Sequence, residues 1–166
     1  ADEYDRSFHK LSPDIAVITA MDADHLDIYG TAKAMEEAFI EFTRKIKPGG
    51  WLISKYGLPR TNDLVATNHI TYHLNDENAT VHTENLQVVN GSYLFDAVMN
   101  DWVLKNVQLN IGGLHNVENT LAAVAVAHIL KLDDEKIKDA VADFKGVKRR
   151  FEYVIAPPPR GEVGRG

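Results

Sequence analysis

The chain has 166 residues, of which 45% are hydrophobic and 25% charged, as is typical of one soluble globular domain. A formal net charge of −6 and an isoelectric point of about 5.6 argue against nucleic acid or a membrane surface as a partner. The sequence contains no cysteine, which excludes disulfides and thiolate chemistry, and no apolar run reaches the roughly 18 residues that a membrane span needs.

The first predicted element is a buried strand over residues 14–20, after the structure-breaking Leu11-Ser12-Pro13. The residues before it are acidic and lack an initiator methionine, so we expect the chain to be cut from a longer sequence. A polar cluster follows the strand directly and comprises Asp22, Asp24, His25 and Asp27. Ligands of open α/β sheets bind beyond the carboxyl ends of strands, where carboxylates and an imidazole suit a divalent cation or proton transfer. The alternative is a polar turn in which the Asp residues only cap the next helix.

A helix with Thr31 as its N-cap is predicted over residues 31–46, and a strand follows over 51–55. The middle third is predicted to be β, with strands over 70–74, 80–89, 91–97 and 102–109. Asn90-Gly91 suits a two-residue hairpin turn. The histidines of this region have no common metal-ligand spacing, so we interpret them as structural or solvated: His69, His73 and His82.

A glycine pair, Gly112-Gly113, precedes a long predicted helix whose first turn carries Asn116 and Asn119 on one face. Backbone N–H groups and the positive end of the helix dipole suit a nucleotide there, and the alternative is that the asparagines only cap the helix. Another helix is predicted from Asp133 to Phe144. The cations Lys148-Arg149-Arg150 are either a solvated patch or a phosphate site. Residues 156–166 are predicted to be a flexible tail.

Four segments, in this order and spacing, resemble the Mur ligases. They are Ala1-Asp2-Glu3-Tyr4-Asp5-Arg6-Ser7-Phe8, Asp22-Ala23-Asp24-His25-Leu26-Asp27-Ile28-Tyr29-Gly30, His115-Asn116-Val117-Glu118-Asn119 and Gly146-Val147-Lys148-Arg149-Arg150-Phe151-Glu152. Within the family, residues 6–8 and 26–30 favour the member that adds L-alanine to UDP-N-acetylmuramate. The alternative within the family is the relative that attaches a tripeptide to the same sugar nucleotide.

The resemblance implies an ATP-dependent amide ligase of the cytoplasmic stage of peptidoglycan assembly. ATP and Mg²⁺ would be its cofactors, and UDP-N-acetylmuramate and L-alanine its substrates, with neither nucleic acid nor membrane as a partner. The muramate carboxylate would be activated as an acyl phosphate and attacked by the amine of L-alanine.

The resemblance also implies roles for individual residues. His25 matches the magnesium-ligand histidine and Arg150 an invariant arginine near the nucleotide, and both are expected to be catalytic. Asn116 and Asn119 match the asparagine pair at the nucleotide, with His115 as a neighbour on the adenine side. The aspartates of the polar cluster would orient the turn rather than bind the metal directly.

The departures from the family are equally specific. The sequence has no phosphate loop of the form G-x-x-G-K-[ST], and the magnesium glutamate would fall just before Ala1. Ile40 stands where some members carry a carbamylated lysine, so none is expected here. We therefore expect residues 1–155 to be an incomplete central ATP-binding domain and residues 156–166 to be a flexible tail or a cloning remnant.

The fold class expected is α/β, with a largely parallel sheet flanked by helices and an antiparallel β portion. Without the phosphate-loop strand, the sheet should have an exposed strand edge that invites self-association. Two functions of other classes stay open. One is a metal-dependent hydrolase built on the polar cluster, and the other is a non-catalytic nucleotide-binding fragment.

Overall fold

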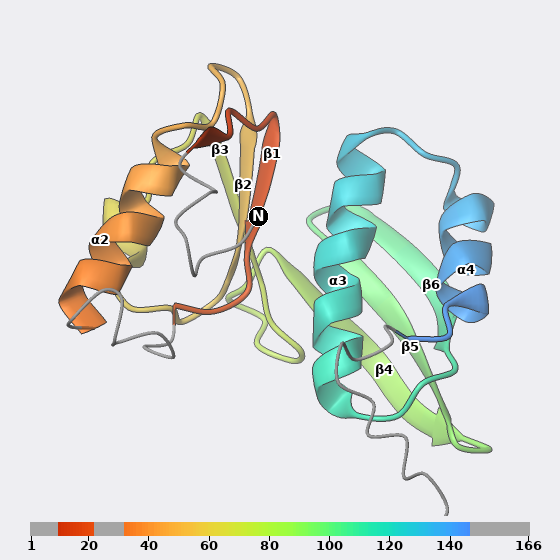
Figure 1. Cartoon of the computed structure of the whole chain (residues 1–166). Helices are drawn as coiled ribbons and strands as arrows, with labels where there is room; N and C mark the ends of the chain where they lie inside the picture. Colours follow the sequence, from red (N-terminus) through yellow and green to blue (C-terminus); the bar gives the residue numbers. More distant parts are fainter. Residues whose placement is uncertain (1–9, 22–31, 147–166) are drawn as a thin grey trace, which may run out of the picture.

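Six strands form one sheet in which the spatial order follows the chain order, β1-β2-β3-β4-β5-β6. The structure is a computed structural model, and it describes residues 10–21 and 32–146 (Figure 1). The strands are β1 (Ile15–Ile18), β2 (Trp51–Lys55), β3 (Asn68–Tyr72), β4 (Val81–Val89), β5 (Ser92–Met99) and β6 (Trp102–Leu109). The helices are α2 (Ala32–Thr43), α3 (Leu114–Ile129), α4 (Asp134–Asp143) and the short 3₁₀ helix η2 (Thr61–Asp63).

Strands β1 to β4 pair in parallel, whereas β4, β5 and β6 form an antiparallel meander. The two parts meet at a single bridge between Tyr72 and Val81. Thr71 and Thr80 reinforce this junction, because the hydroxyl of each accepts a hydrogen bond from the backbone N–H of the other at 3.2 Å. The expected α/β class, with a parallel sheet and an antiparallel portion, is confirmed.

Helices cover both faces of the sheet, with α2 on one side of β1–β3 and α3 on the other (Figure 1). Neighbouring residues of β2 point to opposite faces, so Leu52 packs with Ile40 of α2, and Ile53 packs with Leu121 of α3. A strand with two buried faces reads as a continuous apolar run, which is why the pattern over 51–55 is easy to recognise.

The β4–β5 connection confirms the hairpin predicted at Asn90-Gly91. Both residues have positive φ, 51° and 79°, as a two-residue turn of the I′ type requires. Asparagine and glycine tolerate this region better than other residues, and the strands therefore meet in the register Val89–Ser92.

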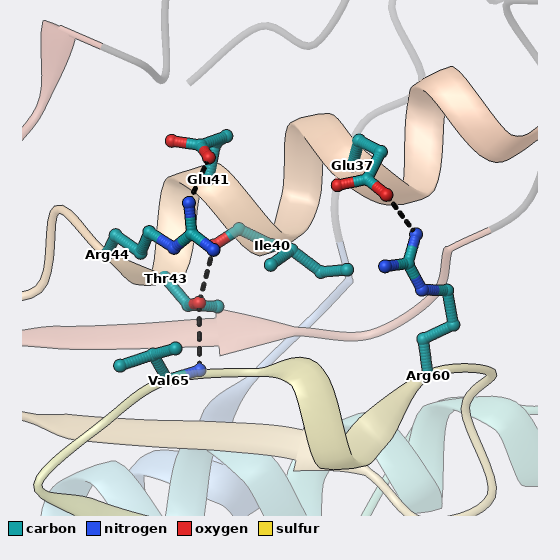
Figure 2. Close-up of polar contacts among 7 residues, drawn as sticks. All are labelled: Glu37, Ile40, Glu41, Thr43, Arg44, Arg60 and Val65. Atoms are coloured by element: carbon teal, nitrogen blue, oxygen red, sulfur yellow. Dashed lines mark hydrogen bonds and ion pairs between the residues drawn. The ribbon is translucent and has the colours of Figure 1, made fainter.

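Helix α2 is fixed to the loop that follows β2 by two polar contacts (Figure 2). The hydroxyl of Thr43, which is 1% exposed, donates to the carbonyl of Ile40 at 2.7 Å and accepts from the backbone N–H of Val65 at 3.0 Å. The guanidinium of Arg60 lies 2.6 Å from Glu37, on the first part of the helix. These contacts set the position of the helix that follows the predicted His25 turn.

We expect Thr43→Val to destabilise the chain by about 1 kcal/mol, because the N–H of Val65 would lose the buried hydroxyl that accepts its hydrogen bond while the side chain at 43 keeps its shape. Urea unfolding measures this loss. Thr61→Val is the matched control, since its hydroxyl only donates to the carbonyl of Leu58 and leaves no N–H without a partner. Equal losses in the two variants would contradict the role given to Thr43.

Several predicted boundaries differ from the structure, and strand β1 covers Ile15–Ile18 rather than residues 14–20. Strand β3 begins at Asn68 rather than residue 70, because its parallel pairing with β2 starts at Trp51 and Asn68. Helix α2 ends at Thr43 rather than residue 46, and residues 44–46 form a turn. Strand β5 runs two residues further than expected, to Met99. Thr31, the expected N-cap, lies outside the described residues.

Strand β1 lies at one end of the sheet and pairs with β2 alone among the described strands. The side chain of Val17 at this edge is 39% exposed. The edge expected from the missing phosphate-loop strand is therefore present in the described part of the chain. Within the same ranges, no helix is both long and apolar enough to cross a membrane.

Candidate functional site

The glycine pair shapes the start of helix α3. Gly113 has φ 97°, a backbone conformation that favours glycine. A Cβ built on it would lie 2.6 Å from Cε1 of His115, an exposed side chain that is free to move aside. The helix has no side-chain cap at this end. Instead, the side-chain nitrogen Nδ2 of Asn116 donates to the backbone carbonyl of Gly112 at 2.6 Å. Asn116 therefore braces the glycine turn and is not an N-cap, which would accept from a backbone N–H.

A groove of about 810 Å³ runs between α3 and α4, and His115, Asn116 and Asn119 all line its walls. Asn119 is exposed, and its side chain makes no hydrogen bond to another described residue. The rest of the lining is mainly apolar and includes Ile111, Ala123, Ala127, Ile137, Val141 and Phe144. Gly146, the last described residue, also lines the groove. An apolar groove with a few amides at one end suits a flat aromatic ring with polar edges.

A second polar feature lies on the sheet side of α3. Glu118 forms an ion pair with Lys55 at 3.0 Å and accepts a hydrogen bond from the backbone N–H of Leu74 at 3.1 Å. Burial, together with the negative charge of Glu118, raises the pKa of Tyr72 to about 12, so the phenol stays neutral. Sequence reasoning missed this cluster, because 63 residues separate Lys55 from Glu118 and neither stands in a motif for charge pairing.

Comparison with known protein families identifies the family of this chain. The family model described as the Mur ligase middle domain matches residues 2–127. The chain belongs to the Mur ligase family. The groove residues His115, Asn116 and Asn119 lie within the matched part, and the family expected from the four segments is confirmed.

Among the relatives, the chain is similar to the UDP-N-acetylmuramate–L-alanine ligases of two bacteria. It is 44% identical to that of Phocaeicola vulgatus over 155 residues, which cover 93% of this chain and 34% of the relative. For Christiangramia forsetii the identity is 42%, covering 93% of this chain and 32% of the relative. This Mur ligase chain therefore spans about a third of the length of the curated relatives it matches.

Solved structures agree with the fold. UDP-N-acetylmuramate–alanine ligase MurC from Thermotoga maritima matches with a TM-score of 0.70 at 25% identity, over 92% of this chain and 33% of that one. MurF from Acinetobacter baumannii matches with a TM-score of 0.72 at 24% identity, over 91% of this chain and 33% of that one, and supports the fold alone.

The three histidines of the middle third each contact a neighbouring residue, which fits their interpretation as structural or solvated. Nε2 of His69 lies 2.7 Å from the hydroxyl of the fully buried Ser54, and burial lowers the pKa of this imidazole. Nδ1 of His73 accepts from the backbone N–H groups of Asn75 and Asp76 and so closes a turn. His82 lies 3.4 Å from the carbonyl of Ala79.

His25, the predicted magnesium ligand, and Arg150, the predicted arginine at the nucleotide, both lie outside the described residues, as do Asp22, Asp24 and Asp27. Within residues 10–21 and 32–146, no group of three or more His, Asp or Glu side chains could hold a metal ion. The described part of the chain thus brings together the three predicted nucleotide residues of α3 and provides no competing metal site. Ile40, at the position of the lysine that some members carbamylate, is buried against the sheet.

Proposed function

We propose that this chain is part of the central ATP-binding domain of a ligase that joins L-alanine to UDP-N-acetylmuramate in peptidoglycan biosynthesis. Residues 1–155 would form the incomplete domain and residues 156–166 a tail. The names of the relatives and the family model support this proposal. The observation that carries it is the groove, where His115, Asn116 and Asn119 line one wall.

The groove would hold the nucleotide by its base. The side-chain amide of Asn119 is free to donate to and accept from the edge of a ring. The side-chain nitrogen of Asn116 donates to the carbonyl of Gly112, and its side-chain oxygen stays available to the base. His115 would flank the base, and the apolar lining behind it would exclude water. Gly146 lines the groove, and Arg150 follows it by four residues in the sequence. Arg150 is the residue proposed to bind the phosphates, for which a guanidinium has the right fork of donors.

The chemistry proposed has two steps. A carboxylate oxygen of the muramate attacks the γ-phosphorus of ATP, the bond to ADP breaks, and an acyl phosphate forms. The amine of L-alanine then attacks the acyl carbon, phosphate leaves, and the nitrogen loses a proton to give the amide. Arg150 would stabilise the negative charge that gathers between the reacting groups.

Magnesium is the metal that the family implies. When bound, Mg²⁺ would neutralise charge on the phosphates, and His25 is the residue of this chain proposed to ligate it. In the sequence, His25 follows the buried Met21 by four residues, and ligands of open α/β sheets bind beyond the carboxyl ends of parallel strands such as β1. The names of the relatives support a cytoplasmic location as part of the proposal.

The exposed edge of β1 leads to a further part of the proposal. If the 166 residues are prepared alone, we expect this edge to pair with a second copy of the chain, because an unpaired strand edge offers N–H and C=O groups to any extended partner.

The nucleotide site is tested by titrating the chain with MgATP in a calorimeter. Losing one hydrogen bond in a desolvated site costs roughly 1–3 kcal/mol, so Asn119→Ala should weaken binding by about 5- to 150-fold. Asn78→Ala, at an exposed turn away from the groove, is the control and should bind as the original chain does. Equal affinities of the two variants would contradict the assignment of the groove.

A further inference from the structure

Glu118 lies between the two asparagines of the first turn but points in another direction. Since each residue of a helix turns by about 100°, Asn116 and Asn119 face the groove while Glu118 faces the sheet. Its side chain is 15% exposed, and its two carboxylate oxygens have different partners. Oε1 lies 3.0 Å from Nζ of Lys55, and Oε2 accepts from the N–H of Leu74 at 3.1 Å.

Both partners are themselves fixed. Lys55 is the last residue of β2 and stands in register with the fully buried Tyr72 of β3. The carbonyl of Leu74, just beyond β3, accepts a hydrogen bond from the N–H of Thr83 on β4 at 3.0 Å. One carboxylate therefore connects α3 to the ends of two parallel strands, at points that the sheet holds in place.

The first turn of α3 needs such support. A helix start has N–H groups without intrahelical partners, and here Gly113 supplies no side-chain cap. Val117 packs this turn against the core, but an apolar contact does not fix the rotation of the turn about the helix axis. Two charge-assisted contacts from one side chain restrict rotation of the turn about the helix axis, which apolar packing alone does less well.

We propose that the ion pair of Lys55 with Glu118 is a positioning device that holds the first turn of α3 at the ends of β2 and β3 and so sets the direction in which Asn116 and Asn119 face the nucleotide. This inference rests on the proposed function, since the nucleotide is what the two asparagines would meet. Glu118 and Lys55 are positioning residues and touch no substrate in this account.

The test uses the 166-residue chain, three single variants, the double variant Lys55→Met/Glu118→Gln, and one control. Glu118→Gln keeps an acceptor for the N–H of Leu74 but removes the charge, Glu118→Leu removes both contacts, and Lys55→Met keeps the apolar stem of the lysine. Glu135→Gln is the matched control, because Glu135 forms a looser pair with Lys138 on α4, at 3.9 Å, and lies outside the groove lining. Amide hydrogen exchange is measured without ligand, and MgATP affinity is measured by titration.

In the variants of Lys55 and Glu118, hydrogen exchange should accelerate at the backbone amides of residues 118–120, which close the first turn of α3. Exchange should stay unchanged at residues 124–128, further along the same helix. MgATP affinity should fall about three- to tenfold in Lys55→Met and Glu118→Gln. The double variant should bind no more weakly than either single one, because the two residues act through one contact. The control should change neither measurement.

Unchanged exchange in the first turn, or acceleration spread evenly along α3, would overturn the positioning role. Additive losses of affinity in the double variant would overturn it as well. If the first turn loosens as expected but the original chain binds no MgATP, the proposed nucleotide site fails and the positioning device with it, whereas the contact of Glu118 with the strand ends stands.

Discussion

Replacing His25 by alanine in the full-length protein should lower kcat for amide synthesis by about 100-fold or more while the fold survives. Phosphoryl transfer depends on positioning and on neutralising the charge that gathers between the γ-phosphate and the attacking carboxylate. Loss of the proposed magnesium ligand would remove part of that neutralisation, whereas helix α2 and strand β1 keep their own packing without it. Steady-state turnover with UDP-N-acetylmuramate, L-alanine and MgATP measures the effect, with thermal unfolding as the check on the fold.

Near-normal turnover of this variant across a magnesium titration would rule out His25 as a ligand. The 166-residue chain provides a second control, because it lacks the phosphate loop and should neither hydrolyse ATP nor form the amide. Residues that act as a unit lose activity together, so a partial set should not give partial activity. Phosphate release by the chain above that of its own His25→Ala variant would instead favour the metal-dependent hydrolase.

Gly50→Ala should destabilise the chain by about 3 kcal/mol, at the upper end of what overpacking costs. A Cβ at this position would lie 2.6 Å from the carbonyl oxygen of Asp14, 2.6 Å from Cγ2 of Ile46 and 2.8 Å from the carbonyl oxygen of Lys47. Two of these three atoms are backbone, and the Asp14 oxygen also accepts from the N–H of Trp51, where β1 and β2 begin to pair. The methyl group would have to push β1 away from β2.

Gly112→Ala is the matched control, since no atom lies within 4 Å of the added methyl and the backbone has no positive φ there. Urea unfolding followed by the fluorescence of Trp51 and Trp102 compares the two variants. Equal midpoints would mean that β1 can shift without cost. A large loss in Gly50→Ala alone would show that the edge strand β1 is held rigidly at its start.

By itself, the sequence determined the elements whose signals are local. Trp51, Leu52 and Ile53 are consecutive apolar residues because both faces of β2 are buried there, and the Asn90-Gly91 turn needs two residues that accept positive φ. The start of α4 was also predictable from the sequence, because Asp133 is a common N-cap residue, and in the structure its carboxylate accepts from the N–H of Glu135. The spacing of Asn116 and Asn119 placed both on one face, and they do line one groove.

Only the tertiary structure decided the features that depend on contacts distant in sequence. Strand β3 starts at Asn68 because β2 supplies its parallel partner, and no local pattern carries that register. The groove exists because α4 packs beside α3, which leaves Ala123 and Ala127 on its wall instead of under the sheet. In the sequence, Glu118 looks like a solvated charge of its own helix. Its ion pair is seen only in the fold, where the end of β2 brings Lys55 next to the first turn of α3. Electrostatic contacts of this kind carry no periodicity, so the fold has to form before they can be recognised.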